Sequence, residues 1–265
     1  MVLNAPAATA LLLTLTVTAG CVVDAPEDME ELVTYGFAHF EDEPRFLQAT
    51  GANLVPLVDE SFDEITEGWR VDNLTSDHLA AAGVDVEGDL HILGAMGAAD
   101  YRHTLDEVLP AIIHPDKASV FDSYLEYRVF DETDRDCFLD RTCEAYRFSF
   151  EQRTEASLLG EAASAGTKHY RWIEPEDGGP AYVVGRSLLP DPIEFTTDLM
   201  EVFQQYDFVL LYPHGDAVRR SETFWVDALL NDDDIPDYFA VEAAAAQMRT
   251  QAGRIDDFLD AEDAR

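Results

Sequence analysis

Two stretches of the sequence, SYLEYRVF at residues 123–130 and EAYRFSFEQ at residues 144–152, alternate apolar and polar side chains with a period of two. In the first stretch, Leu125, Tyr127 and Val129 fall on one face, and in the second Tyr146 and Phe148 do the same. This period is typical of half-buried antiparallel strands, because successive side chains of a strand point to opposite faces of the sheet. We therefore predict two paired antiparallel strands joined by residues 131–143.

Four more strand candidates follow this pair along the chain. Turn-forming residues separate them: Gly178 and Gly179 lie between the first two, and Gly215 precedes the last. The four candidates are KHYRWIE (168–174), AYVVGRSLL (181–189), YDFVLLYP (206–213) and ETFWVDALL (222–230).

Upstream of the pair, an apolar run within residues 89–103 suits a further buried strand. Thr104 and Glu107 then have the spacing of a helix capping box, and apolar residues follow at helical spacing. Residues 116–121 predict a second short helical piece, and residues 27–68 are predicted to be mostly helical, with breaks at Pro44, Gly51 and Pro56.

The chain ends in a predicted long helix. Its apolar residues recur at alternating intervals of three and four, which places them in one stripe along the helix. The stripe consists of Tyr238, Val241, Ala245, Met248, Ala252, Ile255 and Leu259. Several of these side chains are small, so this helix can approach a sheet closely.

This order of elements resembles the START-like helix-grip family of lipid-binding domains. The local likeness lies in HYRWIE (169–174), AYVVGRSLLPDP (181–192), YDFVLLYP (206–213) and TFWVDALLNDDDIPDY (223–238). The resemblance covers roughly residues 89–260 and implies an α+β fold, in which a curved antiparallel sheet of about six to seven strands surrounds the long C-terminal helix. It also implies a cavity for one apolar molecule, commonly a sterol or a phospholipid.

The resemblance makes strand aromatic and aliphatic residues candidates for the lining of such a cavity. The candidate ligand-binding residues are Trp172, Tyr182, Val184, Arg186, Tyr206, Phe208, Leu210 and Trp225. Arg186 is the candidate polar group among them, since ligand cavities are mostly apolar with a few placed polar groups. The alternative is that the apolar residues fill an ordinary core and that Arg186 forms a salt bridge.

The N-terminus has the pattern of an export signal. Residues 5–20 carry no charge and are shorter than the roughly 20 residues needed to span a bilayer as a helix. Thr18-Ala19-Gly20-Cys21 resembles a bacterial lipobox, which implies that Cys21 is acylated and anchors the chain in the membrane. The alternative is an ordinary secretory signal with an incidental cysteine. Because Val22 rather than Asp follows Cys21, we expect the anchored chain to be located at the outer membrane of the cell envelope.

Export places the other two cysteines, Cys137 and Cys143, in an oxidising compartment. We predict that they form a disulfide, because a metal site at this position lacks a second pair of ligands. The expected organisation is a signal peptide (1–20), an acylated cysteine and tether (21–31), a helical N-terminal extension (32–88) and a START-like α+β domain (89–265).

The chain carries 54 Asp and Glu against 17 Lys and Arg, for a formal net charge of −37. Such a surface repels nucleic acid and anionic lipid, so neither is an expected partner. No catalytic motif is present, which favours a protein without enzymatic activity, cofactor or metal. The acidic runs 131–136 and 232–234 are predicted to be solvated loops, since neither follows the order of an EF-hand.

These observations predict an envelope-anchored lipoprotein that binds a hydrophobic ligand, lipid or sterol-like, in a START-like cavity. The alternative is a periplasmic or surface interaction protein with a filled core. A cavity of several hundred Å³ favours the first, and an exposed apolar patch on a solid core favours the second.

Overall fold

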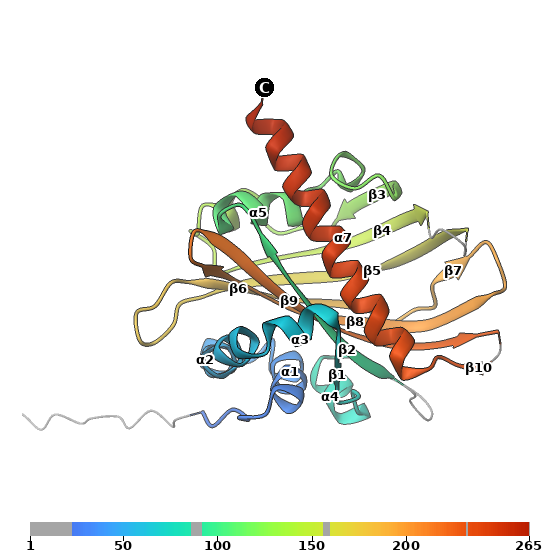
Figure 1. Cartoon of the computed structure of the whole chain (residues 1–265), viewed down its shortest axis with the longest axis horizontal. Coiled ribbons are helices and arrows are strands. Elements are labelled where there is room, and N and C mark those ends of the chain that lie inside the picture. The colour runs from blue at the N-terminus through green and yellow to red at the C-terminus, as the bar shows by residue number, and fades with distance from the viewer. Residues whose placement is uncertain (1–22, 86–91, 156–159, 232, 265) are drawn as a thin grey trace, which may run out of the picture.

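Seven long strands form the sheet that the two-residue period predicts (Figure 1). The computed structural model describes residues 23–85, 92–155, 160–231 and 233–264. The long strands are β2 (Leu93–Tyr101), β3 (Tyr124–Phe130), β4 (Ala145–Glu155), β5 (Glu161–Ile173), β6 (Tyr182–Leu189), β8 (Met200–His214) and β9 (Ala217–Leu230).

Three short strands complete the sheet: β1 (Trp69–Val71), β7 (Glu194–Phe195) and β10 (Asp233–Asp234). The order is β1-β2-β9-β8-β6-β5-β4-β3, with β10 paired to β9 and β7 to β5, and neighbouring strands are antiparallel. The expected six to seven strands are thus the long ones, since a strand of two or three residues is too short to show a period. Because β1 pairs with β2, the N-terminal region contributes to this sheet, and the domain boundary after residue 88 stays a prediction.

One face of the sheet holds the long C-terminal helix α7 (Asp237–Asp263), which runs diagonally across it in Figure 1. Close contact is allowed by Gly97 of β2, where a Cβ atom would lie 2.7 Å from Cγ of Met248. Met248, Ala252 and Ile255 of the predicted stripe are buried, whereas Tyr238 at its start is 66% exposed. An antiparallel sheet curved around a C-terminal helix is the helix-grip arrangement, so the predicted α+β fold class is confirmed.

Shorter helices lie on the same side of the sheet. Helix α5 (Leu105–Ile112) begins at the predicted capping box, where the backbone N–H and Oγ1 of Thr104 donate to Oε2 of Glu107 at 2.9 and 2.6 Å. The short helical piece predicted next is the 3₁₀ turn η1 (Lys117–Ser119). Helix α6 (Arg135–Leu139) between β3 and β4 has too few residues to show a helical period.

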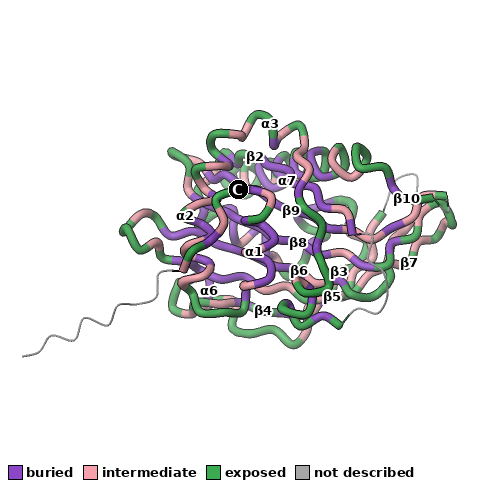
Figure 2. The backbone as a smooth tube through the Cα atoms, turned by 90° about the horizontal axis from the view of Figure 1, so that it is seen from below, coloured by how far each residue is buried: buried purple, intermediate pink, exposed green. Residues whose placement is uncertain are grey.

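The opposite face of the sheet is covered by the N-terminal helices. These are α1 (Met29–Ala38), α2 (Pro44–Glu60), α3 (Phe62–Glu67) and α4 (Ser76–Ala81), so the mostly helical N-terminal extension is confirmed. Central strands are therefore buried on both faces, and β6, β8 and β9 are buried along most of their length (Figure 2). Within the described ranges, no helix combines the length and the apolar character that crossing a membrane requires.

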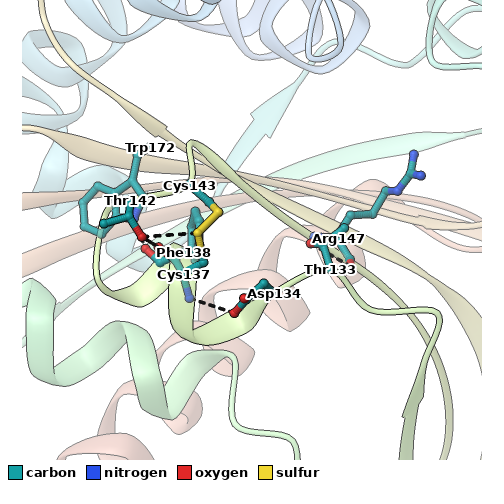
Figure 3. Close-up of a disulfide and its surroundings, with 8 residues drawn as sticks. All are labelled: Thr133, Asp134, Cys137, Phe138, Thr142, Cys143, Arg147 and Trp172. Carbon is teal, nitrogen blue, oxygen red and sulfur yellow. Dashed lines mark hydrogen bonds between the residues drawn. A yellow bond between two sulfur atoms is a disulfide. The ribbon is translucent and has the colours of Figure 1, made fainter.

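Cys137 and Cys143 form the predicted disulfide, with their Cα atoms 5.3 Å apart (Figure 3). Asp134 caps α6 by accepting a hydrogen bond from the backbone N–H of Cys137 at 2.9 Å. The Oγ1 atom of Thr142 lies 3.2 Å from Sγ of Cys137. The indole Nε1 of Trp172 donates to the carbonyl of Phe138 at 2.9 Å. The disulfide therefore closes a short loop that is itself tied to β5.

Candidate ligand-binding cavity

A cavity of about 720 Å³ lies between the sheet and α7. Its lining comes from β2, β4, β5, β6, β8 and β9, from η1, and from the inner side of α7. Phe121, Phe150, Leu189, Phe224 and Ile255 form apolar parts of its wall. The volume is in the range of small-molecule sites in proteins, and the cavity lies beside a packed apolar core on the same face of the sheet.

The centre of the cavity is charged. Lys168 of β5, Asp207 of β8, and Arg220 and Glu222 of β9 all line it. The strand register brings them together, because Ser187 of β6 pairs with both Lys168 and Asp207 on either side, and Val209 of β8 pairs with Glu222. Side chains of residues that are paired directly across neighbouring strands lie on the same face of a sheet. The strand register therefore places these charged side chains on the face that the cavity occupies.

Arg220 and Glu222 form a buried ion pair at this centre, each less than 7% exposed. Nη1 of Arg220 also donates to the hydroxyl of Tyr101 at 3.0 Å and to Oε1 of Gln251 at 2.8 Å. Burial alone would lower the pKa of Arg220, but Glu222 and Tyr101 hold it above its ordinary value. In the described part of the chain, Nε of Arg220 has no hydrogen-bond partner.

Asp207 is buried beside this pair, and its pKa is raised to about 7. The main cause is burial, which disfavours the charged carboxylate, and the nearby Glu222 adds repulsion. Lys168 and hydrogen bonds from Gln205 and Ser187 act in the opposite direction. Asp207 therefore changes its charge near neutral pH. Strongly shifted groups in a cavity are typical of functional sites.

Both lysines of the chain, Lys117 and Lys168, line the cavity. Nζ of Lys117 donates to the carbonyl of Ile112, and burial holds its pKa well below the usual range. Nζ of Lys168 lies 5.4 Å from the centre of the Phe150 ring. Lys117 is thus engaged by the protein, whereas the ammonium group of Lys168 faces an aromatic ring.

All eight residues predicted to bind a ligand are described by the structure, and none of them lines the cavity beneath α7. Trp172 lies on the same face as the cavity but packs on α6, with the guanidinium of Arg141 4.2 Å from the centre of its ring. The opposite core, beneath the N-terminal helices, contains Tyr182, Val184, Tyr206, Phe208, Leu210 and Trp225.

Arg186 also faces the N-terminal helices. Its Nη1 donates to the carbonyl of Phe37 at 3.2 Å, its Nη2 pairs with Glu41, and its guanidinium stacks over Phe40 at 4.8 Å. This is the salt-bridged arginine of the alternative interpretation. Burial lowers its pKa, and Glu41 acts against that effect.

Tyr182 borders a second, separate hollow of about 710 Å³ on the outside of α2. Its hydroxyl donates to the carbonyl of Leu47 at 3.0 Å, and a Cβ atom at Gly51 would collide with it. The hollow also borders Val55, Pro180 and Tyr212. No charged cluster comparable to that of Asp207 and Arg220 lines it among the described residues.

The sequence analysis missed Lys117, Lys168, Tyr170, Asp207, Arg220 and Glu222. Two signals pointed towards them. Lys168, Asp207 and Glu222 each lie within an apolar strand segment, and Lys117 and Lys168 are the only lysines of a very acidic chain. A period of two separates the faces of a strand but does not say which face a cavity occupies.

No group of three His, Cys, Asp or Glu side chains that could hold a metal ion occurs in the portion of the chain that the structure describes. Asp131 lies in the loop after β3 and Asp233 lies in β10, while Asp232 is outside the described residues. Cys21, the predicted site of acylation, and the signal peptide are also outside them.

Comparison with solved structures finds distant similarities. A STAR-related lipid transfer protein from Xanthomonas axonopodis is 14% identical, with 67% of this chain and 90% of that chain covered and a TM-score of 0.41. A START superfamily protein from Mycobacterium smegmatis is 9% identical, with 63% and 97% covered and a TM-score of 0.38. A norcoclaurine synthase mutant from Thalictrum flavum is 9% identical, with 67% and 99% covered and a TM-score of 0.37.

No protein-family model matches the sequence, and no curated protein matches it. The function is therefore inferred from the geometry of the cavity.

Proposed function

We propose that this chain is an envelope-anchored lipoprotein that holds one hydrophobic small molecule in the cavity beneath α7, without catalysing a reaction. The observation that carries the proposal is the cavity of about 720 Å³, whose wall combines apolar side chains with polar and charged ones. That combination of a mostly preformed hollow and a small number of placed polar groups is typical of sites for small molecules.

The ligand is expected to be amphipathic rather than wholly apolar. A hydrocarbon without polar groups would leave Lys168, Asp207 and the Arg220–Glu222 pair against an apolar surface, which is unfavourable for charged groups. A molecule with an apolar body and one polar end would satisfy both parts of the cavity.

The anchoring part of the proposal rests on the lipobox-like sequence that ends at Cys21. Acyl chains on this residue would hold the domain at a membrane, and we propose the outer membrane of the cell envelope as its location. An anchored domain with such a cavity can hold or hand over a ligand near the membrane surface. Mass spectrometry of the exported chain tests this step: we expect an acylated N-terminal Cys21, and an unmodified mature N-terminus would contradict it.

Native mass spectrometry tests the cavity. The full chain with Cys21→Ser, exported but not acylated, is expected to retain or take up one ligand per molecule from a mixed lipid panel. Ala240→Trp, which places a large side chain on α7 where Ala240 lines the cavity, should reduce this occupancy at least fivefold. Ala261→Trp, on an exposed position of the same helix, is the matched control and should not. A ligand-free mass with no uptake would contradict the proposal.

A second candidate function is protein interaction. Four large apolar side chains, Leu199, Phe203, Tyr238 and Phe239, are 38–66% exposed, in the segment that begins β8 and in the first turn of α7. Exposed apolar side chains of this kind occur at protein–protein contacts. Capture of a partner that is lost with Tyr238→Ser and Phe203→Ser, in a chain that takes up no lipid, would favour this function.

A further inference from the structure

The charges that line the cavity are balanced, unlike those of the chain as a whole. The sequence has 54 acidic residues against 17 Lys and Arg, yet the cavity is lined by four residues of each sign. The cations are Lys117, Lys168, Arg220 and Arg254, and the carboxylates are Asp122, Glu155, Asp207 and Glu222. In a protein with a net charge of −37, this local gathering of cations favours a ligand that carries negative charge.

Three of the four cations are satisfied by the protein. Arg220 is paired with Glu222, Arg254 is paired with Asp122, and Lys117 donates to the backbone carbonyl of Ile112. Among the described residues, no carboxylate lies within ion-pair distance of Lys168, whose contact is the ring of Phe150. Lys168 is therefore the ammonium group of the cavity that the protein leaves without an acceptor.

A second group that lines the cavity also lacks a partner. Arg220 is 6% exposed and lines the cavity, and its Nε–H has no acceptor in the part of the chain that the structure describes. A buried donor without a hydrogen bond costs free energy, so such groups are normally satisfied by protein, water or ligand. A water or a polar atom of the ligand would satisfy this donor.

Among the described residues, Lys168 is the cavity cation left without an acceptor, so one negative charge on the ligand would balance it. Glu222 already neutralises Arg220, and Asp207 is neutral for much of the time near pH 7 because burial raises its pKa. Asp207 faces Lys168 from β5, Ser187 from β6 and Glu222 from β9, so its ionised form would repel an anion while its protonated form would not.

We propose that the ligand is an amphipathic monoacid, an apolar body ending in one carboxylate, and that Lys168 binds this carboxylate. The inference rests on the proposed function, since it names the polar end of the molecule that the cavity holds. The apolar body would lie along the wall formed by Phe150, Leu189 and Phe224.

Three probes with the same twelve-carbon chain separate the polar end from the apolar body: dodecanoate, dodecanol and dodecylamine. Their binding to the full chain carrying Cys21→Ser is measured by titration calorimetry below the micellar concentration. We expect dodecanoate to bind at least tenfold more tightly than the other two.

Lys168→Gln removes the ammonium group, so it should weaken dodecanoate at least tenfold and change dodecanol less than twofold. Arg153→Gln is the matched control, because Arg153 lies on β4 outside the cavity, where it pairs with Glu126 and Glu161. This control should leave the affinity for dodecanoate unchanged.

A second measurement tests the inference even if the Lys168→Gln variant fails to fold, because it uses the chain without any substitution in the cavity. Because the chain has two lysines and Lys117 is buried, reductive methylation followed by peptide mass spectrometry reports on Lys168. Dodecanoate should slow the methylation of Lys168 at least tenfold, and dodecanol should slow it less.

The outcomes distinguish the two proposals. If dodecanol or dodecylamine binds as tightly as dodecanoate, or if dodecanoate leaves the methylation of Lys168 unchanged, the monoacid inference is wrong while the cavity still binds ligands. If none of the three probes binds and no lipid is taken up, both the inference and the proposed function are wrong.

Discussion

The two faces of the sheet are built from the same strands but differ in what they enclose. On β8, Asp207 faces the cavity under α7, while its neighbours Tyr206 and Phe208 face the N-terminal helices and are at most 2% exposed. On β9, Phe224 faces the cavity and Trp225 faces the filled core. One face is thus solid and mainly apolar, and the other combines an apolar core with a hollow that is lined partly by charges.

Under the proposed function, the filled N-terminal face contributes to stability alone, whereas the α7 face contributes both to stability and to ligand binding. Four short helices lie against the N-terminal face, where aromatic side chains such as Phe37, Tyr206 and Trp225 pack against each other. A single long helix crosses the other face and leaves space beside it. Substitutions on the first face should therefore change folding, and those on the second should change binding.

The largest effect should come from Phe208→Ala, compared with Phe224→Ala as its matched partner. Phe208 is buried in the filled core, so its loss leaves a new void and should cost about 3–5 kcal/mol of unfolding free energy. Phe224 already borders the cavity, so its loss should cost only about 2 kcal/mol. Urea unfolding checks both values, and equal costs would show that the two faces do not differ in packing.

A smaller effect is expected from removal of the disulfide. The Cys137–Cys143 bond closes a loop with a sequence separation of 6, for which the chain-entropy estimate is about 2 kcal/mol. Cys137→Ser with Cys143→Ser should lower the unfolding free energy by this amount and leave ligand binding intact, since neither cysteine lines the cavity. A loss of binding equal to the loss of stability would mean that the α6 loop shapes the cavity.

The smallest effect concerns Asp207 and depends on pH. Because its folded-state pKa is raised to about 7 from a model-peptide value of 3.8, the folded state binds the proton more tightly than the unfolded state. The free energy of unfolding therefore falls as pH rises from about 4 to 7. Above that range Asp207 is ionised in both states, and the free energy of unfolding stays at its lower value.

Asp207→Asn should remove this dependence. The variant is expected to exceed the parent chain in stability by about 1 kcal/mol or more at pH 8, and by a smaller margin at pH 5, where Asp207 is still protonated in the folded state. Urea unfolding at the two pH values measures the difference. Greater stabilisation at pH 5 than at pH 8 would contradict the assignment of a raised pKa to Asp207.

Much of the fold followed from local patterns in the sequence. The alternation around Tyr127 and Tyr146 identified β3 and β4, the spacing of Thr104 and Glu107 identified the start of α5, and the small residues of the stripe around Ala252 identified α7. These signals are local because the period of a strand or helix and the hydrogen bonds of a cap involve residues close in the chain. The disulfide was also predictable, because Cys137 and Cys143 are the two cysteines other than Cys21 and the expected export would expose them to an oxidising compartment.

The site was decided by the tertiary structure. The period of two groups Tyr206 with Phe208 and separates both from Asp207, but it does not show which of these two faces will meet the N-terminal helices and which will meet α7. Lys168, Asp207 and Glu222 come from three strands, and only the register of β5, β6, β8 and β9 makes them neighbours. By itself, the sequence determined the strands, the long helix and the acidic character of the chain; the packing of helices on two sides of one sheet determined where the cavity lies.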